Sequence, residues 1–254
     1  MRRFFYWYVP LIVAVAATAL FASGFYSFVH GDIGTPVSLI PTKTSPLTLT
    51  VASRAITPII LGDSLARGTG DTAGLGISGR LDQELKRRNI RANRTVNIAV
   101  NGARTSDLLH QIESHNVQTI LSQSNVIIIS IGGNDLWGGS DLRTARPANP
   151  EATMNGVLDR VVKVVSSVRA VNPTARIFII GLYNPFATTP AGKMLTPLVN
   201  KWNAKLIDGF SSDVNIVVVQ TADLFTAHDR LSFDRFHPGD EGYALIARRI
   251  ADAI

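Results

Sequence analysis

The sequence contains no cysteine, and this absence excludes several kinds of protein. Without cysteine there can be no disulfide, no zinc site built on thiolates and no lipid-modified cysteine. Dense runs of basic residues are also missing, because the longest is Lys86-Arg87-Arg88 and the net charge is only +6. A nucleic-acid-binding surface normally has a denser basic stripe, so we expect no nucleic-acid partner.

Charged residues are absent from Phe4 to Gly31, directly after Arg2 and Arg3. This run exceeds the roughly 20 apolar residues that cross a bilayer, and aromatic residues gather near both of its ends. We expect residues 1–31 to form a transmembrane helix whose basic end stays in the cytoplasm. The length of the run favours an uncleaved anchor. The alternative is a signal peptide cleaved near Ala22-Ser23-Gly24, which would release a secreted domain.

Residues 32–55 are rich in Thr, Pro and Ser, which is typical of a tether. From residue 56 onward, short apolar runs alternate with amphipathic stretches, and this predicts one α/β domain over residues 56–254. Five runs are predicted to be strands: Pro58–Leu61, Val96–Val100, Val126–Ile131, Arg176–Gly181 and Val214–Val219. The predicted helices are Ile77–Asn89, a helix start at Ser106–Ser114, Glu151–Val171, Leu195–Phe210 and Glu241–Ile254. Because the strands are apolar almost throughout, we expect a five-stranded parallel sheet between two layers of helices.

Unusual residues follow three of the predicted strands. The first strand leads into Gly62-Asp63-Ser64-Leu65, the second into Asn101-Gly102-Ala103 and the third into Gly132-Gly133-Asn134-Asp135. Near the C-terminus stands Asp234-Arg-Phe-His237-Pro238. Functional groups collect at the carboxyl ends of the strands in such sheets, so we expect these four segments to meet at one edge.

These segments contain what acyl transfer requires. A serine hydroxyl needs a base that takes its proton, and the base needs a third group that orients it. Ser64 is the candidate nucleophile, His237 the candidate base and Asp234 the candidate orienting carboxylate. The oxyanion that forms on attack needs preorganised hydrogen-bond donors. The candidate donors are the backbone N–H groups of Ser64 and Gly102 and the side-chain amide of Asn134.

With these motifs the sequence resembles the SGNH/GDSL hydrolases over residues 59–253. The four residues recorded in the name SGNH match Ser64, Gly102, Asn134 and His237. Three sequence blocks of the family match as well: Gly62–Leu65 with Gly68, Gly132–Asp135 and Asp234–Pro238. The chain departs at Ala66, where many members have Ser or Thr, but this position takes no part in the chemistry. The resemblance implies a flavodoxin-like fold, esterase, lipase or thioesterase activity, and neither a metal nor an organic cofactor.

We therefore expect a serine esterase or lipase-type hydrolase that cleaves small-molecule or lipid esters outside the cytoplasmic membrane. Trp137 and Tyr183 follow the third and fourth strands and are candidates for the substrate pocket, although packing explains Trp137 equally well. Two alternatives stay open. One is a carbohydrate O-acetylesterase or acyltransferase of the cell envelope, and the other is a catalytically silent binding module tethered to the envelope. Nucleotide binding is disfavoured, because no glycine-rich dinucleotide motif or P-loop lysine follows the first strand.

Overall fold

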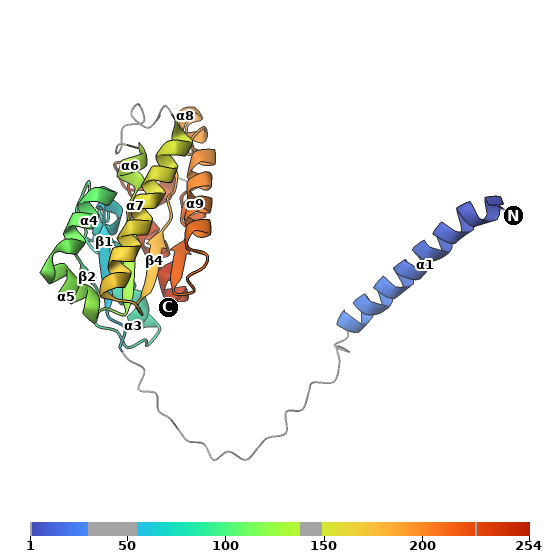
Figure 1. Ribbon diagram of the computed structural model, residues 1–254, viewed down its shortest axis with the longest axis horizontal. Coiled ribbons are helices and arrows are strands. Elements are labelled where there is room, and N and C mark those ends of the chain that lie inside the picture. The colour runs from blue at the N-terminus through green and yellow to red at the C-terminus, as the bar shows by residue number, and fades with distance from the viewer. Residues whose placement is uncertain (1, 30–54, 138–148, 227) are drawn as a thin grey trace, which may run out of the picture. The chain divides into compact units, whose positions relative to one another are not determined.

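The computed structural model describes residues 2–29, 55–137, 149–226 and 228–254 of the chain (Figure 1). The chain divides into two compact units, one within Met1–Thr50 and the other within Val51–Ile254. Except for its last residue, the tether predicted over residues 32–55 lies outside the described residues. The three-part division of the chain therefore stays a prediction.

The N-terminal unit contains a single helix, α1 (Arg2–Val29), where the sequence predicts a helix that spans a membrane. Within the described part of the chain, however, no helix is both long enough and apolar enough to cross a bilayer. The structure thus agrees with the helix and does not support its expected passage through a membrane.

Five parallel strands form the sheet of the larger unit, as the sequence predicts. They are β1 (Pro58–Gly62), β2 (Val96–Asn97), β3 (Val126–Ser130), β4 (Arg176–Ile180) and β5 (Ile216–Val219). Their order in the sheet is β2-β1-β3-β4-β5. The chain adds β2 on one side of β1 and then returns to add β3 on the other side. Such a switch point leaves a crevice at the carboxyl ends of the strands, where ligands bind in sheets of this kind.

Strand β2 is shorter than the predicted strand Val96–Val100. It lies at the edge of the sheet, and short edge strands limit unwanted pairing with other chains. Beyond β2, the N–H groups of Ile98 and Val100 still donate to the carbonyl oxygens of Ile60 and Gly62, at 3.0 and 2.9 Å. The segment after β2 therefore stays beside β1 up to the point where β1 ends.

Helices cover both faces of the sheet and complete three layers, as expected. Alternate strand residues point to opposite faces, so Ile59 and Leu61 join one buried cluster while Ile60 joins the other. The first face is covered by α4 (Thr105–Glu113), α5 (His115–Gln123), α7 (Pro150–Val171) and α9 (Thr196–Phe210). The second face is covered by α3 (Gly76–Arg87) and α10 (Asp240–Asp252). Figure 1 shows α7 and α9 side by side over the sheet.

Several short elements are absent from the prediction. They are α2 (Ser64–Arg67), α6 (Gly133–Trp137), α8 (Pro190–Lys193) and the 3₁₀ turns η1 (Ala222–Phe225) and η2 (His228–Arg230). The helix predicted over Ser106–Ser114 is α4, whereas α5 is also absent from the prediction. Ser114 has an extended backbone with ψ of 129° and separates α4 from α5. Two of the short helices, α2 and α6, begin just beyond the carboxyl ends of β1 and β3 and carry candidate site residues.

Candidate active site

The chain turns sharply after β1, and this turn presents Ser64. Gly62 has a φ of +130°, and a Cβ atom there would lie 1.8 Å from the carbonyl oxygen of Ser130 on β3. Glycine alone fits such a close approach between two backbones. The carboxylate of Asp63 then accepts hydrogen bonds from two N–H groups in the first turn of α2 and caps that helix. Ser64 is thereby the first residue of α2, directly beyond the carboxyl end of β1.

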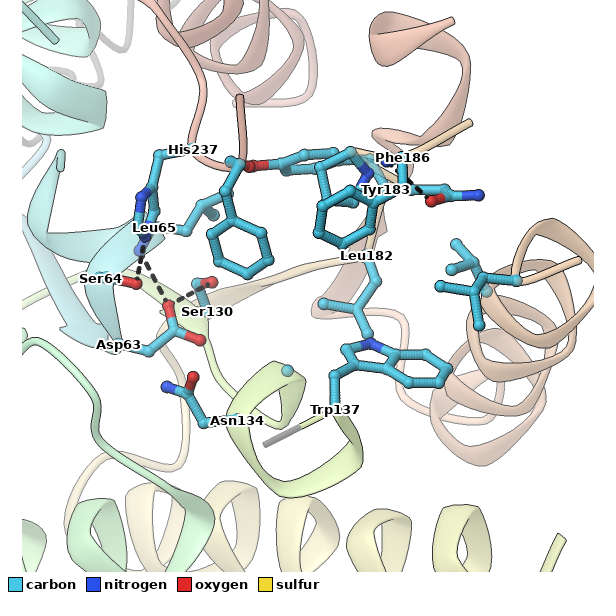
Figure 2. A pocket seen from close by; sticks show the side chains of 17 residues that line it. Asp63, Ser64, Leu65, Ser130, Asn134, Trp137, Leu182, Tyr183, Phe186 and His237 are labelled. Carbon is cyan, nitrogen blue, oxygen red and sulfur yellow. Dashed lines mark hydrogen bonds between the residues drawn. The ribbon is translucent and has the colours of Figure 1, made fainter. Parts of the chain in front are cut away.

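Ser64, His237 and Asp234 form a continuous chain of hydrogen bonds. The Oγ atom of Ser64 lies 2.8 Å from Nε2 of His237, although the two residues are 173 positions apart. Figure 2 shows this hydrogen bond as a dashed line. The Nδ1 atom of the same ring lies 2.7 Å from Oδ2 of Asp234. When Nδ1–H is donated to Asp234, Nε2 is left as an acceptor for the serine hydroxyl. The arrangement can therefore move the proton of Ser64 onto His237.

Several hydrogen bonds fix the carboxylate of Asp234 in a tight turn. Its Oδ1 atom accepts from the hydroxyl of Ser232 at 2.5 Å and from the N–H groups of Phe236 and His237 at 2.9 Å each. Partial burial by itself would raise the pKa of Asp234, but the hydrogen bonds from Ser232, His237 and the backbone lower it to about 2. Asp234 is therefore ionised at neutral pH and can stabilise a protonated imidazole.

Gly102 and Asn134 lie in segments that follow the two neighbours of β1. Gly102 follows β2 with a φ of +78°, and Asn134 belongs to α6 after β3. The Nδ2 atom of Asn134 donates to the carbonyl oxygen of Ala103 at 3.0 Å, which joins the two segments. Among the residues that the structure describes, the N–H groups of Ser64 and Gly102 donate to no protein acceptor. Those two groups and the second hydrogen on Nδ2 can therefore serve an oxyanion.

All of these segments fall within residues 60–245, which match the sequence model of the GDSL-like Lipase/Acylhydrolase family. The chain belongs to this family. It is also 30% identical over 207 residues to the uncharacterized protein YpmR of Bacillus subtilis (strain 168), covering 76% of this chain and 79% of YpmR. The spore germination lipase LipC of Bacillus licheniformis is 25% identical over 214 residues, which are 76% of this chain and 93% of LipC.

Solved structures agree with this family membership at the level of the fold. The lipase Lip_vut3 from a goat rumen metagenome superposes with a TM-score of 0.67 at 22% sequence identity. The match covers 78% of this chain and 97% of that lipase. The chain is therefore a GDSL-type serine hydrolase that acts on ester bonds.

The GDSL-type hydrolase also has a buried carboxyl group, that of Asp63, next to Ser64. The side chain of Asp63 accepts a hydrogen bond from the hydroxyl of Ser130 at 3.1 Å, and the residue is 6% exposed. Burial raises the pKa of Asp63 to about 6, because removal from water disfavours the charged form more than the hydrogen bonds from Ser130 and α2 favour it. The charge of Asp63 thus changes within one unit or so of neutral pH.

An apolar pocket of about 80 Å³ opens beside Ser64, His237 and Asn134 (Figure 2). Its apolar lining includes Trp137, Leu182, Tyr183, Phe186, Leu195 and Val199. Trp137 and Tyr183, the two pocket candidates from the sequence, are both in this lining. Gly102 is not part of the lining and lies in the loop that Asn134 contacts.

Sequence reasoning missed four of these six apolar residues, namely Leu182, Phe186, Leu195 and Val199. Leu182 directly follows the fourth predicted strand, so the rule about strand ends could have identified it. Val199 lies on α9, and Leu195 and Phe186 lie in the segment before that helix, where no motif marks them. Tyr183 also has a second contact that its position did not indicate, because its hydroxyl donates to the carbonyl oxygen of Phe236 at 2.7 Å. In the described ranges, no group of three or more His, Cys, Asp or Glu side chains is arranged to hold a metal ion.

Proposed function

We propose that this hydrolase cleaves carboxylic esters through Ser64, His237 and Asp234, in two steps linked by an acyl-enzyme. One observation carries the proposal. The hydrogen-bonded chain from Asp234 through His237 ends on the hydroxyl of Ser64, and this hydroxyl lies at an apolar pocket. An apolar pocket suits the acyl part of an ester, and the hydrogen-bonded chain suits attack on its carbonyl carbon.

In the first step, the Oγ atom of Ser64 attacks the carbonyl carbon while Nε2 of His237 takes the serine proton. The negative charge moves to the carbonyl oxygen, where the N–H groups of Ser64 and Gly102 and the amide of Asn134 donate to it. The carbon–oxygen bond to the alcohol then breaks, and His237 gives its proton to the leaving oxygen. Asp234 keeps the imidazole in the required tautomer and stabilises its charged form.

In the second step, water takes the place of the alcohol. His237 removes a proton from a water molecule, and the resulting hydroxide attacks the acyl carbon of the ester on Ser64. The same donors stabilise the second oxyanion. The bond between the acyl carbon and Oγ then breaks, and the proton on His237 returns to Ser64. The products are the free carboxylic acid and the regenerated enzyme.

A fluorophosphonate probe tests the proposed nucleophile, because it bonds to activated serines. We expect one label per chain on Ser64 and no label after Ser64→Ala. Ser122→Ala is the control, since Ser122 is an exposed serine on α5 that donates to the carbonyl oxygen of Thr119. Folded protein that neither labels nor cleaves p-nitrophenyl esters would contradict the proposal. Cellular effects that persist with Ser64→Ala would favour the binding-module alternative.

We also propose that the acyl group is short and apolar. Asp63 and His237 are the only acidic or basic residues among the described residues of the pocket lining. The pocket volume of about 80 Å³ is about half that of a 150 Å³ cavity that holds one benzene molecule. By this comparison it has room for about three or four carbon atoms. A butyryl group is therefore expected to fit better than a long fatty acyl chain.

A series of p-nitrophenyl esters from acetate to palmitate tests the size of the acyl group. We expect kcat/KM to be highest near butyrate, and Trp137→Ala to move this optimum to longer chains by enlarging the pocket. Met194→Ala is the control, because Met194 precedes Leu195 but is 66% exposed and lies outside the lining. An optimum at eight or more carbons in the wild-type enzyme would contradict the proposal.

A carbohydrate O-acetylesterase is the second candidate, since an acetyl group also fits the pocket. The two candidates differ in the alcohol, which lies outside the acyl pocket. Release of acetate from acetylated glycans can be compared with hydrolysis of short esters of simple alcohols. Faster turnover of the glycans would favour the second candidate.

The proposal that the hydrolase works outside the cytoplasm rests on the sequence. Arg2 and Arg3 precede a stretch without charged residues that ends at Gly31, which is typical of exported chains. Protease treatment of intact cells should degrade the hydrolase domain if it is exposed on the cell, and a secreted domain should be found in the medium. A protein found only in the cytosol would contradict the proposal.

A further inference from the structure

Three side chains connect the segments that carry Gly102 and Asn134. Asp135 follows Asn134 in α6, Thr105 is the first residue of α4, and Arg160 lies in the middle of α7. Thr105 is completely buried, and the side chain of Asp135 is 5% exposed. We refer to Thr105, Asp135 and Arg160 as the Arg160 network.

Hydrogen bonds join every pair within the Arg160 network. The carboxylate of Asp135 accepts from the N–H group of Thr105 at 3.0 Å and from its hydroxyl at 2.6 Å. The guanidinium of Arg160 donates to the hydroxyl oxygen of Thr105 at 2.8 Å and to Oδ1 of Asp135 at 3.2 Å. The hydroxyl of Thr105 thus accepts from one partner and donates to the other. One cation on α7 therefore contacts both the start of α4 and the middle of α6.

We infer that Arg160 is a positioning residue for the two oxyanion donors outside α2, the N–H group of Gly102 and the amide of Asn134. The inference rests on the proposed function of those donors. They belong to segments that follow different strands, with β1 between them, so the sheet alone does not fix their separation. The amide of Asn134 donates to Ala103, which stands between Gly102 and the start of α4. A shift of α4 relative to α6 would therefore move both donors.

The chemistry of the Arg160 network explains why an arginine stands at this position. A carboxylate as buried as that of Asp135 needs a paired cation or several hydrogen bonds. The planar guanidinium donates along two directions at once and reaches both Thr105 and Asp135, whereas a lysine ammonium is a single point of charge. Without the cation, Asp135 would be expected to turn toward water and release the start of α4.

The main test is the steady-state kinetics of Arg160→Met on a p-nitrophenyl ester. Oxyanion donors act in the transition state, and small displacements of such groups are costly. We expect kcat to fall by about tenfold to a hundredfold while KM changes by less than about twofold. Arg160→Lys should recover part of the loss.

Arg169→Met is the matched control. Arg169 lies on the same helix and forms an ion pair with Asp213 at 3.1 Å, and it also donates to Ala175 just before β4 begins. It therefore lies toward the end of the sheet opposite the site. The control should lower the midpoint of thermal unfolding without lowering kcat. An equal loss of kcat in both variants would overturn the inference.

A double-mutant cycle separates positioning from general damage. If Arg160 acts through the oxyanion donors, Arg160→Met should cost clearly less in kcat when Asn134 has already been changed to Ala. The same fold-loss in both backgrounds would overturn the inference.

Thr105 supplies a second test if Arg160→Met does not fold. Thr105→Ser keeps the hydroxyl and should retain most of kcat. Thr105→Val removes the hydroxyl and should lower kcat by about tenfold to a hundredfold. Equal kcat in Thr105→Ser and Thr105→Val would overturn the inference about Arg160 but would leave the proposed function intact. A wild-type enzyme without esterase activity would refute the proposed function itself.

Discussion

The buried carboxyl of Asp63 is expected to make the stability of the hydrolase domain depend on pH, and Asp63→Asn should remove that dependence. The pKa of Asp63 is raised by burial from its ordinary value of 3.8 to about 6 in the folded protein. Between these two values the unfolded chain has lost the proton while the folded domain still holds it. The unfolded state then binds fewer protons, so the free energy of unfolding falls as the pH rises.

The size of this effect follows from the shift in pKa. A shift of one unit corresponds to about 1.4 kcal/mol, so a rise from 3.8 to about 6 costs about 3 kcal/mol once Asp63 is ionised in both states. The free energy of unfolding begins to fall near pH 4, and the fall is complete above about pH 7. Asp234 has the opposite effect in a separate range, because its folded pKa of about 2 lies below its ordinary value of 3.8. Its contribution is lost only as the pH falls below about 4.

Asparagine has nearly the shape of a protonated aspartic acid and carries no charge. Its Oδ1 atom can accept from Leu65, Ala66 and Ser130, as the Oδ1 atom of Asp63 does. Urea unfolding followed by circular dichroism measures the free energy of unfolding of the wild-type protein and of Asp63→Asn between pH 4 and pH 7.5. We expect equal stability near pH 4 and an advantage for Asp63→Asn that grows to about 3 kcal/mol at pH 7.5. A difference that stays constant over this range would refute the argument.

Three further variants test the site and the turn that carries it. Asp234→Asn should lower kcat by about 10⁴-fold, because the amide favours the wrong tautomer of His237, and single-turnover kinetics would show the loss in the acylation step. Asn134→Ala should lower kcat by about 10²- to 10³-fold with little change in KM, and a comparable rise in KM would contradict a role limited to the transition state. Gly62→Ala should destabilise the domain by more than about 3 kcal/mol, because its Cβ would lie 1.8 Å from a carbonyl oxygen of β3 and φ is +130°. An unchanged midpoint of thermal unfolding would contradict this last prediction.

The strands could be predicted where burial makes them apolar on both faces. The predicted strand Val126–Ile131 differs from β3 by one residue at its end, and β4 differs as little from Arg176–Gly181. Strand β2 was predicted less well, since it ends at Asn97 although the N–H groups of Ile98 and Val100 still donate to β1. Helix α4 was predicted to within one residue at each end, whereas no helix was predicted over α5.

The amino-acid sequence by itself determined which chemical groups stand at the strand ends. Ser64, Asn134 and His237 could be identified because motifs and strand patterns are local properties of the chain. The tertiary structure alone decided how these groups are supported. No local sequence pattern indicates that Asp63 is buried. Nor does one indicate that Arg160 contacts Thr105, which is 55 positions away in the sequence. Burial and contact depend on how elements distant in the sequence pack together. This packing sets the pKa of Asp63 and the expected positions of the oxyanion donors.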